Sequence, residues 1–260
     1  MHIATWNVNS LKVRLPQVLD WLAAHPVDVL CLQETKLRDE HFPVAALAEA
    51  GYEVAFAGQP TYNGVAILGR RATVGMPADV IVGNPHFDDP QQRLISATIG
   101  GLRVVCAYFP NGQAVGSEKF DYKLRWIDAL IAWLGDSAAA APAPIALLGD
   151  FNIAPEDRDV HDPEKWAGQI HCSDEERARF SRLVALGMVD AFRLFEQPEK
   201  QFSWWDYRML GFRRNAGLRI DHILVDARIA GRVEACRIDR EPRKLDKPSD
   251  HAPVIAELTP

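Results

Sequence analysis

Short apolar runs alternate along the chain with stretches in which apolar residues recur every three or four positions. The runs over residues 2–6 and 27–32 have the length and composition of buried strands. Between them, four apolar residues fall at helical spacing: Leu15, Val18, Leu19 and Leu22. Pro16 is expected in the first turn of this helix and Pro26 just after its end. A strand, a helix and a strand in this order predict a parallel βαβ unit.

The rest of the chain predicts a β-rich middle section and then a second α/β unit. Strands are expected over 52–57, 65–69, 74–82, 93–99 and 102–109, with a short helix over 44–50 and a Gly100-Gly101 hairpin turn. A helical stripe from Phe120 to Leu134 and an Ala/Pro-rich link from Ala138 to Pro144 lead to an apolar strand at 145–148. A helix over 174–186 and strands over 201–204, 218–225, 233–239 and 254–258 complete the pattern. We therefore predict an α/β fold with one domain over 1–260, in which helices flank two packed mixed β-sheets.

Composition is that of a globular protein that can bury a sizeable core. Of 260 residues, 48% are apolar and 25% are charged, and no stretch reaches the roughly 20 apolar residues of a membrane span. No cationic and apolar leader opens the sequence, so we expect a cytoplasmic protein without membrane contact, and a monomer by default. The four cysteines form no CxxC pair, which predicts reduced core cysteines rather than a zinc site or disulfides.

Net charge is −6, which argues against a protein that binds nucleic acid through charge alone. The local distribution is different, because arginines crowd one stretch: Arg208, Arg213, Arg214 and Arg219. Such a stretch is either a solvated face or a contact for phosphates. An acidic site that holds a divalent cation would also make the total charge negative.

Polar side chains follow several of the predicted strands. The apolar run at 145–148 ends in Gly149, Asp150, Phe151 and Asn152, and Asp150 and Asn152 share a face of an extended chain. Such a pair can hold a metal, a water or a phosphate, or can only form turn hydrogen bonds. Similar residues end or precede other strands: Asn7, Glu34, Tyr108, Asp221, Asp250 and His251. The chain has no nucleophile elbow and no glycine-rich phosphate loop. These oxygen-rich side chains suit Mg²⁺ or Mn²⁺ and fit hydrolysis of a phosphodiester.

Seven strings in order along the chain resemble those of the exonuclease III family of DNA-repair nucleases: WNVNSL, LQET, YFPNG, LGDFN, FSWWDYR, GLRID and PSDHAP. The family lies within the endonuclease/exonuclease/phosphatase superfamily. The resemblance implies the four-layer α/β sandwich of deoxyribonuclease I. It also implies a Mg²⁺-dependent enzyme, with Mn²⁺ able to substitute, that acts on double-stranded DNA with abasic sites or 3′ ends. Its expected activities are apurinic/apyrimidinic (AP) endonuclease and 3′ exonuclease action, which leave a 3′-hydroxyl.

The resemblance also assigns roles to single residues. Glu34 becomes the main metal ligand, within a set that comprises Asn7, Glu34, Asp150, Asn152, Asp250 and His251. Asp150 is expected to position or deprotonate the attacking water, and Asn152 to hold the phosphate or the water. Asp221 is expected to fix His251 as an imidazolium that contacts the scissile phosphate. Tyr108 is expected to donate a hydrogen bond to the phosphate or the leaving oxygen.

Four further residues are implied as contacts to DNA: Asn111, Trp205, Arg208 and His171. The tryptophans of the FSWWDYR string could instead be core residues. His171 lies in a loop that helps to form the wall around the extruded sugar, so a bulky side chain there could favour an ordinary 3′ terminus over an abasic site.

Two other functions are compatible with the same residues. One is a phosphatase or phospholipase of the same superfamily, which would share the metal site and the Asp–His pair. The other is a DNA-binding module without catalytic activity. The FSWWDYR and GLRID strings favour DNA over the first, and the competent residue at every matched position argues against the second.

Overall fold

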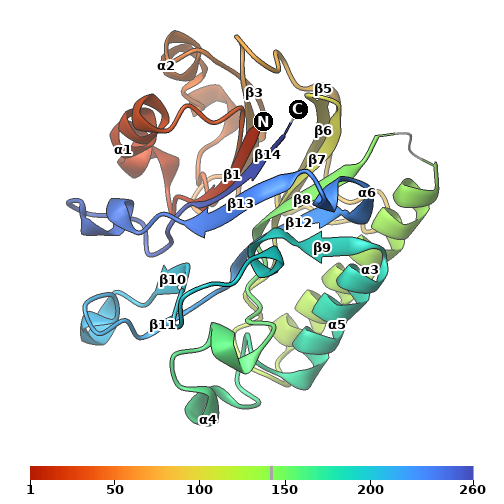
Figure 1. Cartoon of the computed structure of the whole chain (residues 1–260), viewed down its shortest axis with the longest axis vertical. Coiled ribbons are helices and arrows are strands. Elements are labelled where there is room, and N and C mark those ends of the chain that lie inside the picture. The colour runs from red at the N-terminus through yellow and green to blue at the C-terminus, as the bar shows by residue number, and fades with distance from the viewer. Residues whose placement is uncertain (141–142, 260) are drawn as a thin grey trace.

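Two six-stranded mixed sheets form the centre of the computed structural model, which describes residues 1–140 and 143–259 (Figure 1). The first sheet has the order β13-β14-β1-β2-β4-β3 and the second the order β5-β6-β7-β8-β12-β9. The first sheet consists of β1 (His2–Asn7), β2 (Val29–Gln33), β3 (Tyr52–Ala57), β4 (Val65–Arg70), β13 (Val233–Ile238) and β14 (Val254–Leu258). The second consists of β5 (Ala78–Val82), β6 (Leu94–Ile99), β7 (Leu102–Tyr108), β8 (Ile145–Asp150), β9 (Met188–Asp190) and β12 (Asp221–Asp226).

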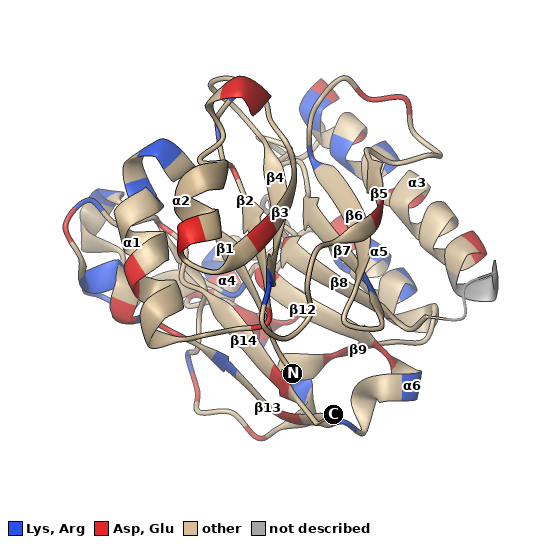
Figure 2. Cartoon of the chain, turned by 90° about the horizontal axis from the view of Figure 1, so that it is seen from above, with Lys and Arg blue, Asp and Glu red and all other residues tan. Residues whose placement is uncertain are grey.

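Helices cover the outer face of each sheet, which gives four layers (Figure 2). The first sheet is covered by α1 (Leu11–Ala24) and α2 (Val44–Glu49), and the second by α3 (Glu118–Ala140) and α5 (Asp174–Ala185). The smaller elements are α4 (Pro163–Trp166), α6 (Ala227–Ala230), β10 (Trp204–Trp205) and β11 (Gly217–Leu218). Single 3₁₀ turns lie at Asp39–His41, Asp157–Asp159, Ala191–Leu194, Arg208–Leu210 and Glu241–Lys244. This is the predicted four-layer sandwich.

The two predicted α/β halves are present in the topology. β1 pairs in parallel with β2 across α1, and β7 pairs in parallel with β8 across α3. The β6–β7 hairpin turns at Gly100 and Gly101, both with positive φ, as predicted. One cluster of side chains from both sheets fills the space between them. The single domain over 1–260 stays a prediction.

Alternation along each strand divides its side chains between two cores. On β8, Ala146 and Leu148 face the first sheet, whereas Ile145 and Leu147 face the helices α3 and α5. The apolar run of β8 is continuous because both faces of this strand are buried. All four cysteines are free and buried, as expected from their spacing.

Several predicted boundaries differ from those in the structure. α1 begins at Leu11, so Pro16 lies in its second turn, where it is exposed and its ring can face solvent. β5 begins only at Ala78, and β10 occupies Trp204–Trp205 instead of 201–204. The strand predicted over 218–225 is split into β11 and β12, which belong to different sheets.

α3 continues to Ala140, so the first residues of the predicted Ala/Pro-rich link are helical, and residues 141–142 of that link lie outside the described residues. The three-residue strand β9 was not predicted. Within the described part of the chain, the helices are all too short or too polar to cross a bilayer.

Candidate active site

Alternation turns the polar side chains at four strand ends into the gap between the sheets. Asn7 ends β1, Tyr108 ends β7, Asp150 ends β8 and Asp221 begins β12. Each lies an even number of residues from a side chain of the inter-sheet core, as Asp150 does from Leu148. Strand register pairs Asp150 with Tyr108 on one side and with Asp221 on the other. The sequence therefore collects these groups at one end of the gap.

Three of the predicted side chains form a cluster that could hold a metal ion. Ligand atoms of Glu34, Asp150 and His251 lie within 4.8 Å of one another, and we call this group the metal-capable cluster. Asn7 bridges it, since its Nδ2 donates to Glu34 Oε1 at 2.9 Å and to Asp150 Oδ2 at 2.9 Å. The Asn7 oxygen accepts from the backbone N–H of Asn9. In this orientation Asn7 positions the two carboxylates, and its amide must rotate before it can serve as the predicted ligand.

Glu34 reaches the gap through an unusual backbone conformation. Simple alternation after Leu32 would send its side chain toward the helix side of the first sheet. Glu34 instead has φ 52°, in the left-handed region, which costs a residue with a Cβ about 1–2 kcal/mol. The Lys36 ammonium lies 2.8 Å from Glu34 Oε2. This carboxylate is therefore presented to a cation at the rim of the site.

Asp150 is a buried carboxyl group that gains and loses its proton near physiological pH. Burial raises the pKa of Asp150 to about 7, and the charge of Asp221 adds to the rise while His251 opposes it. Asp150 Oδ1 accepts from the backbone N–H of Asn152 at 2.9 Å. A carboxyl group with this pKa can accept a proton and release it again near pH 7.

His251 and Asp221 form a buried ion pair. His251 Nδ1 lies 2.9 Å from Asp221 Oδ2, and its Nε2 lies 3.7 Å from Asp150 Oδ2. Burial lowers the pKa of His251, but the charges of Asp221 and Asp150 outweigh it and raise the pKa to about 10. As an imidazolium, His251 has no free lone pair and suits contact with an anion. The carboxylates of Glu34 and Asp150 remain as the donors for a cation.

Asn152, Asn111 and His171 form a wall beside Asp150. Asn152 has φ 51°, and its Oδ1 accepts from Asn111 Nδ2 at 3.3 Å. His171 Nδ1 donates to the Asn152 carbonyl at 2.7 Å, which leaves Nε2 facing Asn111 Nδ2 at 3.5 Å. Burial, aided by the Lys123 charge, lowers the pKa of His171 to about 4, so its ring is neutral. The structure thus places all three predicted residues together.

Tyr108 lies half-buried at the edge of the metal-capable cluster. The Arg93 guanidinium lies 4.8 Å from the centre of its ring. Burial raises the pKa of Tyr108 well above its usual value, and the charges of Glu34 and Asp150 add to this. Its hydroxyl therefore keeps its proton and is a hydrogen-bond donor.

Asp250 lies next to His251 in sequence but has other partners. Its Oδ1 accepts from Asn9 Nδ2 at 2.9 Å and its Oδ2 from Trp204 Nε1 at 2.9 Å. Burial raises the pKa of Asp250, but His251 and these donors outweigh it and lower the pKa below its usual value. The predicted contact of Asp250 with the metal stays a prediction.

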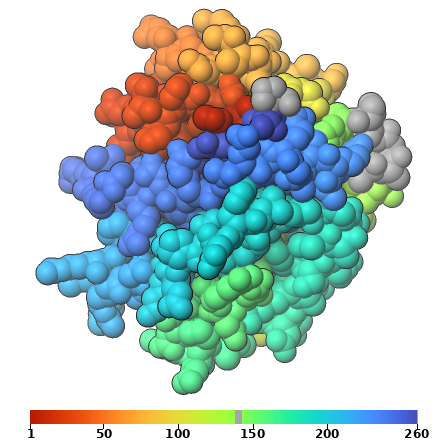
Figure 3. Space-filling view, viewed as in Figure 1, coloured from red at the N-terminus to blue at the C-terminus, as the bar shows by residue number. Residues whose placement is uncertain are grey.

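The segment between β10 and β11 projects from the body of the molecule (Figure 3). Arg208 is exposed there, paired with Asp206. Trp205 is fully buried, and its Nε1 donates to Asn215 Oδ1. The Trp205 ring packs into a small core with Phe202, which favours the core alternative for this residue over the predicted contact with DNA.

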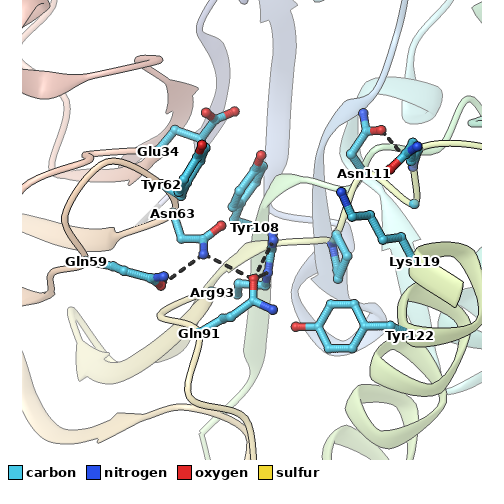
Figure 4. A pocket seen from close by; sticks show the side chains of 13 residues that line it. Glu34, Gln59, Tyr62, Asn63, Gln91, Arg93, Tyr108, Asn111, Lys119 and Tyr122 are labelled. Carbon is cyan, nitrogen blue, oxygen red and sulfur yellow. Dashed lines mark hydrogen bonds between the residues drawn. The ribbon is translucent and has the colours of Figure 1, made fainter.

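A pocket of about 600 Å³ opens beside the metal-capable cluster (Figure 4). Glu34, Arg93, Tyr108 and Asn111 line it, and further members were not predicted: Gln59, Tyr62, Asn63, Gln91 and Lys119. The Asn63 amide donates to both glutamines, so the lining is a connected polar network. Amide residues in predicted loops carry no periodic signal, and only a family comparison could have found them.

The donor set fits a hard divalent cation. Glu34 and Asp150 supply carboxylate oxygens, and the cysteines are buried elsewhere and unpaired. Lys36 already holds a positive charge against Glu34. Oxygen donors of this kind suit Mg²⁺ or Mn²⁺ and suit zinc poorly.

Comparisons with known proteins show which family the chain resembles over nearly its whole length. Residues 4–251 match the model of the Endonuclease/Exonuclease/phosphatase family. The chain is 37% identical to Exodeoxyribonuclease III of Haemophilus influenzae, over 99% of this chain and 100% of the relative. It is 29% identical to the DNA repair nuclease APEX1 of Danio rerio, over 99% of this chain and 82% of the relative.

Solved structures are similar over nearly the whole chain. The 3′ phosphatase NExo from Neisseria, bound to a product DNA hairpin, is 49% identical with a TM-score of 0.96, over 100% of this chain and 99% of that one. An AP endonuclease from Archaeoglobus fulgidus is 37% identical with a TM-score of 0.93, over the full length of both chains.

Proposed function

Because the chain belongs to the exonuclease III/AP endonuclease family of DNA-repair phosphodiesterases, we propose that it hydrolyses phosphate esters at the 3′ ends of double-stranded DNA with a divalent metal ion. The product is a DNA 3′-hydroxyl. The observation that carries the proposal is the metal-capable cluster of Glu34, Asp150 and His251 with Asp221 behind the imidazolium. It combines a carboxylate for a cation, a carboxyl group with a pKa near 7 that can accept a proton from a water, and a fixed positive charge for a phosphate.

Glu34, with Asn7 beside it, is the proposed holder of the metal ion, which is Mg²⁺ or Mn²⁺ by its ligand chemistry. When bound, the ion supplies Lewis-acid polarisation of a phosphate oxygen. Asp150 accepts the proton of the attacking water, which its pKa of about 7 permits at neutral pH.

The phosphate is proposed to lie between the side chains of Asn152 and His251. The His251 imidazolium stabilises the negative charge that develops on the phosphate, and Asp221 keeps the ring protonated and oriented. Tyr108 donates its hydroxyl proton in a hydrogen bond to the phosphate or the leaving oxygen. Asp250 supports the site from the side, through its effect on His251.

His171 is proposed to direct the enzyme toward 3′ ends and away from internal abasic sites. Its ring is buried and held by the Asn152 carbonyl, with its centre 6.5 Å from that of Trp204. It thereby fills space between Asn152 and Trp204, which an extruded abasic sugar would need. The 3′ phosphatase and 3′–5′ exonuclease named for the Neisseria relatives support this choice of activity.

Double-stranded DNA is the proposed partner, and Asn111 and Arg208 are its proposed contacts. Asn111 lines the pocket beside the metal-capable cluster, and Arg208 is exposed on the projecting segment between β10 and β11. Arginine side chains in such positions bind phosphates and fix the register of the duplex.

Three duplexes test the proposal: one with a recessed 3′-hydroxyl end, one with a 3′-phosphate and one with an internal abasic site. In Mg²⁺ the protein should process both 3′ ends and cleave the abasic site at least about tenfold more slowly, and EDTA should abolish all activity. His171→Gly should raise abasic cleavage. Strong abasic cleavage by the wild type that His171→Gly leaves unchanged would contradict the assigned preference, and activity in EDTA would contradict the metal.

A further inference from the structure

A buried ion pair, Lys123 with Glu176, lies behind the wall of the proposed active site. Both side chains are completely buried, and Lys123 Nζ contacts Glu176 Oε1. Lys123 belongs to α3 and Glu176 to α5, so the pair joins the two helices that cover the second sheet. A buried ion pair is weak support for stability, because removing both charges from water offsets most of their attraction. Its contacts indicate another role.

Lys123 uses its remaining protons on two backbone carbonyls of the site. Nζ donates to the carbonyl of Asn152 at 2.7 Å and to that of Asn111 at 3.2 Å. The ammonium therefore has three acceptors for its three protons. The side chains of both asparagines belong to the wall beside Asp150, where they are hydrogen-bonded to each other.

Glu176 holds the third part of the wall. Its Oε1 accepts from the backbone N–H of His171 at 3.1 Å, and its Oε2 accepts from the backbone N–H and hydroxyl of Ser173. His171 has φ 71° and Asn152 has φ 51°, so both residues adopt conformations that need external support. One ion pair thus fixes the backbone of three separate segments.

We propose that Lys123 and Glu176 form a positioning pair, which sets Asn111, Asn152 and His171 against the 3′ end of the DNA. The proposal rests on the proposed nuclease function. Neither residue touches substrate; they act through the backbone of the residues that do. Loss of the pair releases the backbone carbonyls of Asn152 and Asn111, so that the side chains that face the phosphate can shift. Hydrolysis is sensitive to small shifts of such side chains.

The test replaces both partners at once, with Lys123→Met/Glu176→Met, so that no unpaired charge remains buried. The matched control is Asp128→Asn, which removes the negative charge of a second α3–α5 contact, that of Asp128 with Arg179 and Arg182, which is partly exposed. Turnover of a duplex with a recessed 3′ end is measured in Mg²⁺ and divided by the folded fraction from circular dichroism at the assay temperature. KM is measured in the same series.

The expected result is a normalised kcat at least about tenfold below that of Asp128→Asn, with KM changed less than threefold. A smaller fall in kcat overturns the positioning role, because a purely structural pair would alter only the folded fraction. If the double variant does not fold, Glu176→Gln is judged by the same criterion. Wild-type protein and Asp150→Asn are run alongside: an inactive wild type refutes the nuclease function, whereas an active wild type with an unaffected double variant refutes only the positioning pair.

Discussion

Adjacent residues of β12, Asp221 and His222, belong to two different groups of charged side chains. One group has an excess of negative charge, and in the other the charges are balanced. Asp221 faces His251 and the metal-capable cluster. His222 belongs to what we call the buried arginine cluster: Asp159, Asp190, Arg193, Arg219 and His222. Both groups are buried, so burial alone does not explain why one is a candidate for chemistry and the other is not.

The buried arginine cluster is balanced and its ionic groups have protein partners. Arg219 donates to Asp159 and lies 2.9 Å from Asp190, and Arg193 also contacts Asp159. His222 stays neutral because burial and the Arg219 charge lower its pKa to about 4. Two carboxylates therefore face two guanidiniums, and no ligand is needed.

The active-site group is unbalanced. Its carboxylates, Glu34, Asp150, Asp221 and Asp250, face the His251 imidazolium and the Lys36 ammonium. Burial raises the pKa of Asp150, and the charges of Asp221 and Glu34 add to the rise while His251 opposes it. The comparison teaches that a ligand site is recognised by the charge that the protein leaves uncompensated.

The largest expected effect is that of Asp150→Asn on activity. Loss of the proton acceptor should lower kcat about 10³-fold with little change in KM. The folded protein holds Asp150 at a raised pKa, so the cost of its charged form builds up as pH rises from about 4 to about 7 and is complete above pH 7. Asn should therefore increase the free energy of unfolding at pH 8 by roughly 1 kcal/mol or more. Urea unfolding at pH 5 and pH 8 checks this, and a variant less stable than the wild type at pH 8 would contradict it.

Arg219→Met should have the opposite signature. It leaves Asp159 and Asp190 partly uncompensated in the interior, which should cost about 3–5 kcal/mol of unfolding free energy. Activity per folded molecule should stay within about twofold of the wild type at low temperature. The control is Arg228→Met, which breaks the surface pair with Asp226 and should leave stability close to wild type. A normally stable Arg219→Met protein would remove the distinction between the two groups.

Acid should destabilise the buried arginine cluster through His222. Its folded pKa of about 4 lies below the unfolded value of 6.5, so its contribution is complete above pH 6.5 and is lost as pH falls toward 4. At pH 5 the loss is about 2 kcal/mol for this residue. His222→Gln should reduce the fall in unfolding free energy between pH 7 and pH 5 by that amount. Parallel pH profiles for wild type and variant would show that His222 does not carry the effect.

The smallest effect is expected for Arg208→Ala on the exposed segment. Loss of one phosphate contact should raise KM for duplex DNA a few-fold at about 0.1 M salt and lower the slope of binding against log salt by about one. Arg228→Ala, an exposed arginine at α6, is the matched control. Equal salt slopes for the two variants would place DNA away from the β10–β11 segment.

Much of the fold and the site could be predicted from local patterns. The apolar run on β8 has both faces buried, and alternation along β8 and β12 sends Asp150 and Asp221 into the same gap. The prediction of a parallel βαβ unit follows from the same patterns and is confirmed. The cytoplasmic location, the monomeric state and the metal identity stay predictions.

Other features depend on contacts that no local pattern contains. Lys123 lies within the helical stripe of α3. A lysine there is predicted to be exposed, yet its contacts in the folded protein bury it. Glu34 enters the gap through a left-handed φ that alternation does not predict. Trp205 and Trp204 are neighbours in one string, and only packing decides which of them is fully buried.

Manganese binding tests the uncompensated charge of the metal-capable cluster most directly. Mn²⁺ is titrated into wild-type protein, Glu34→Gln and the control Asp128→Asn, and the free ion is followed by electron paramagnetic resonance. We expect one saturable site in the wild type and in Asp128→Asn, and at least about tenfold weaker binding in Glu34→Gln, because Glu34 is the proposed main ligand. Equal Mn²⁺ affinity of Glu34→Gln and the wild type would contradict the assignment of this cluster as the metal site.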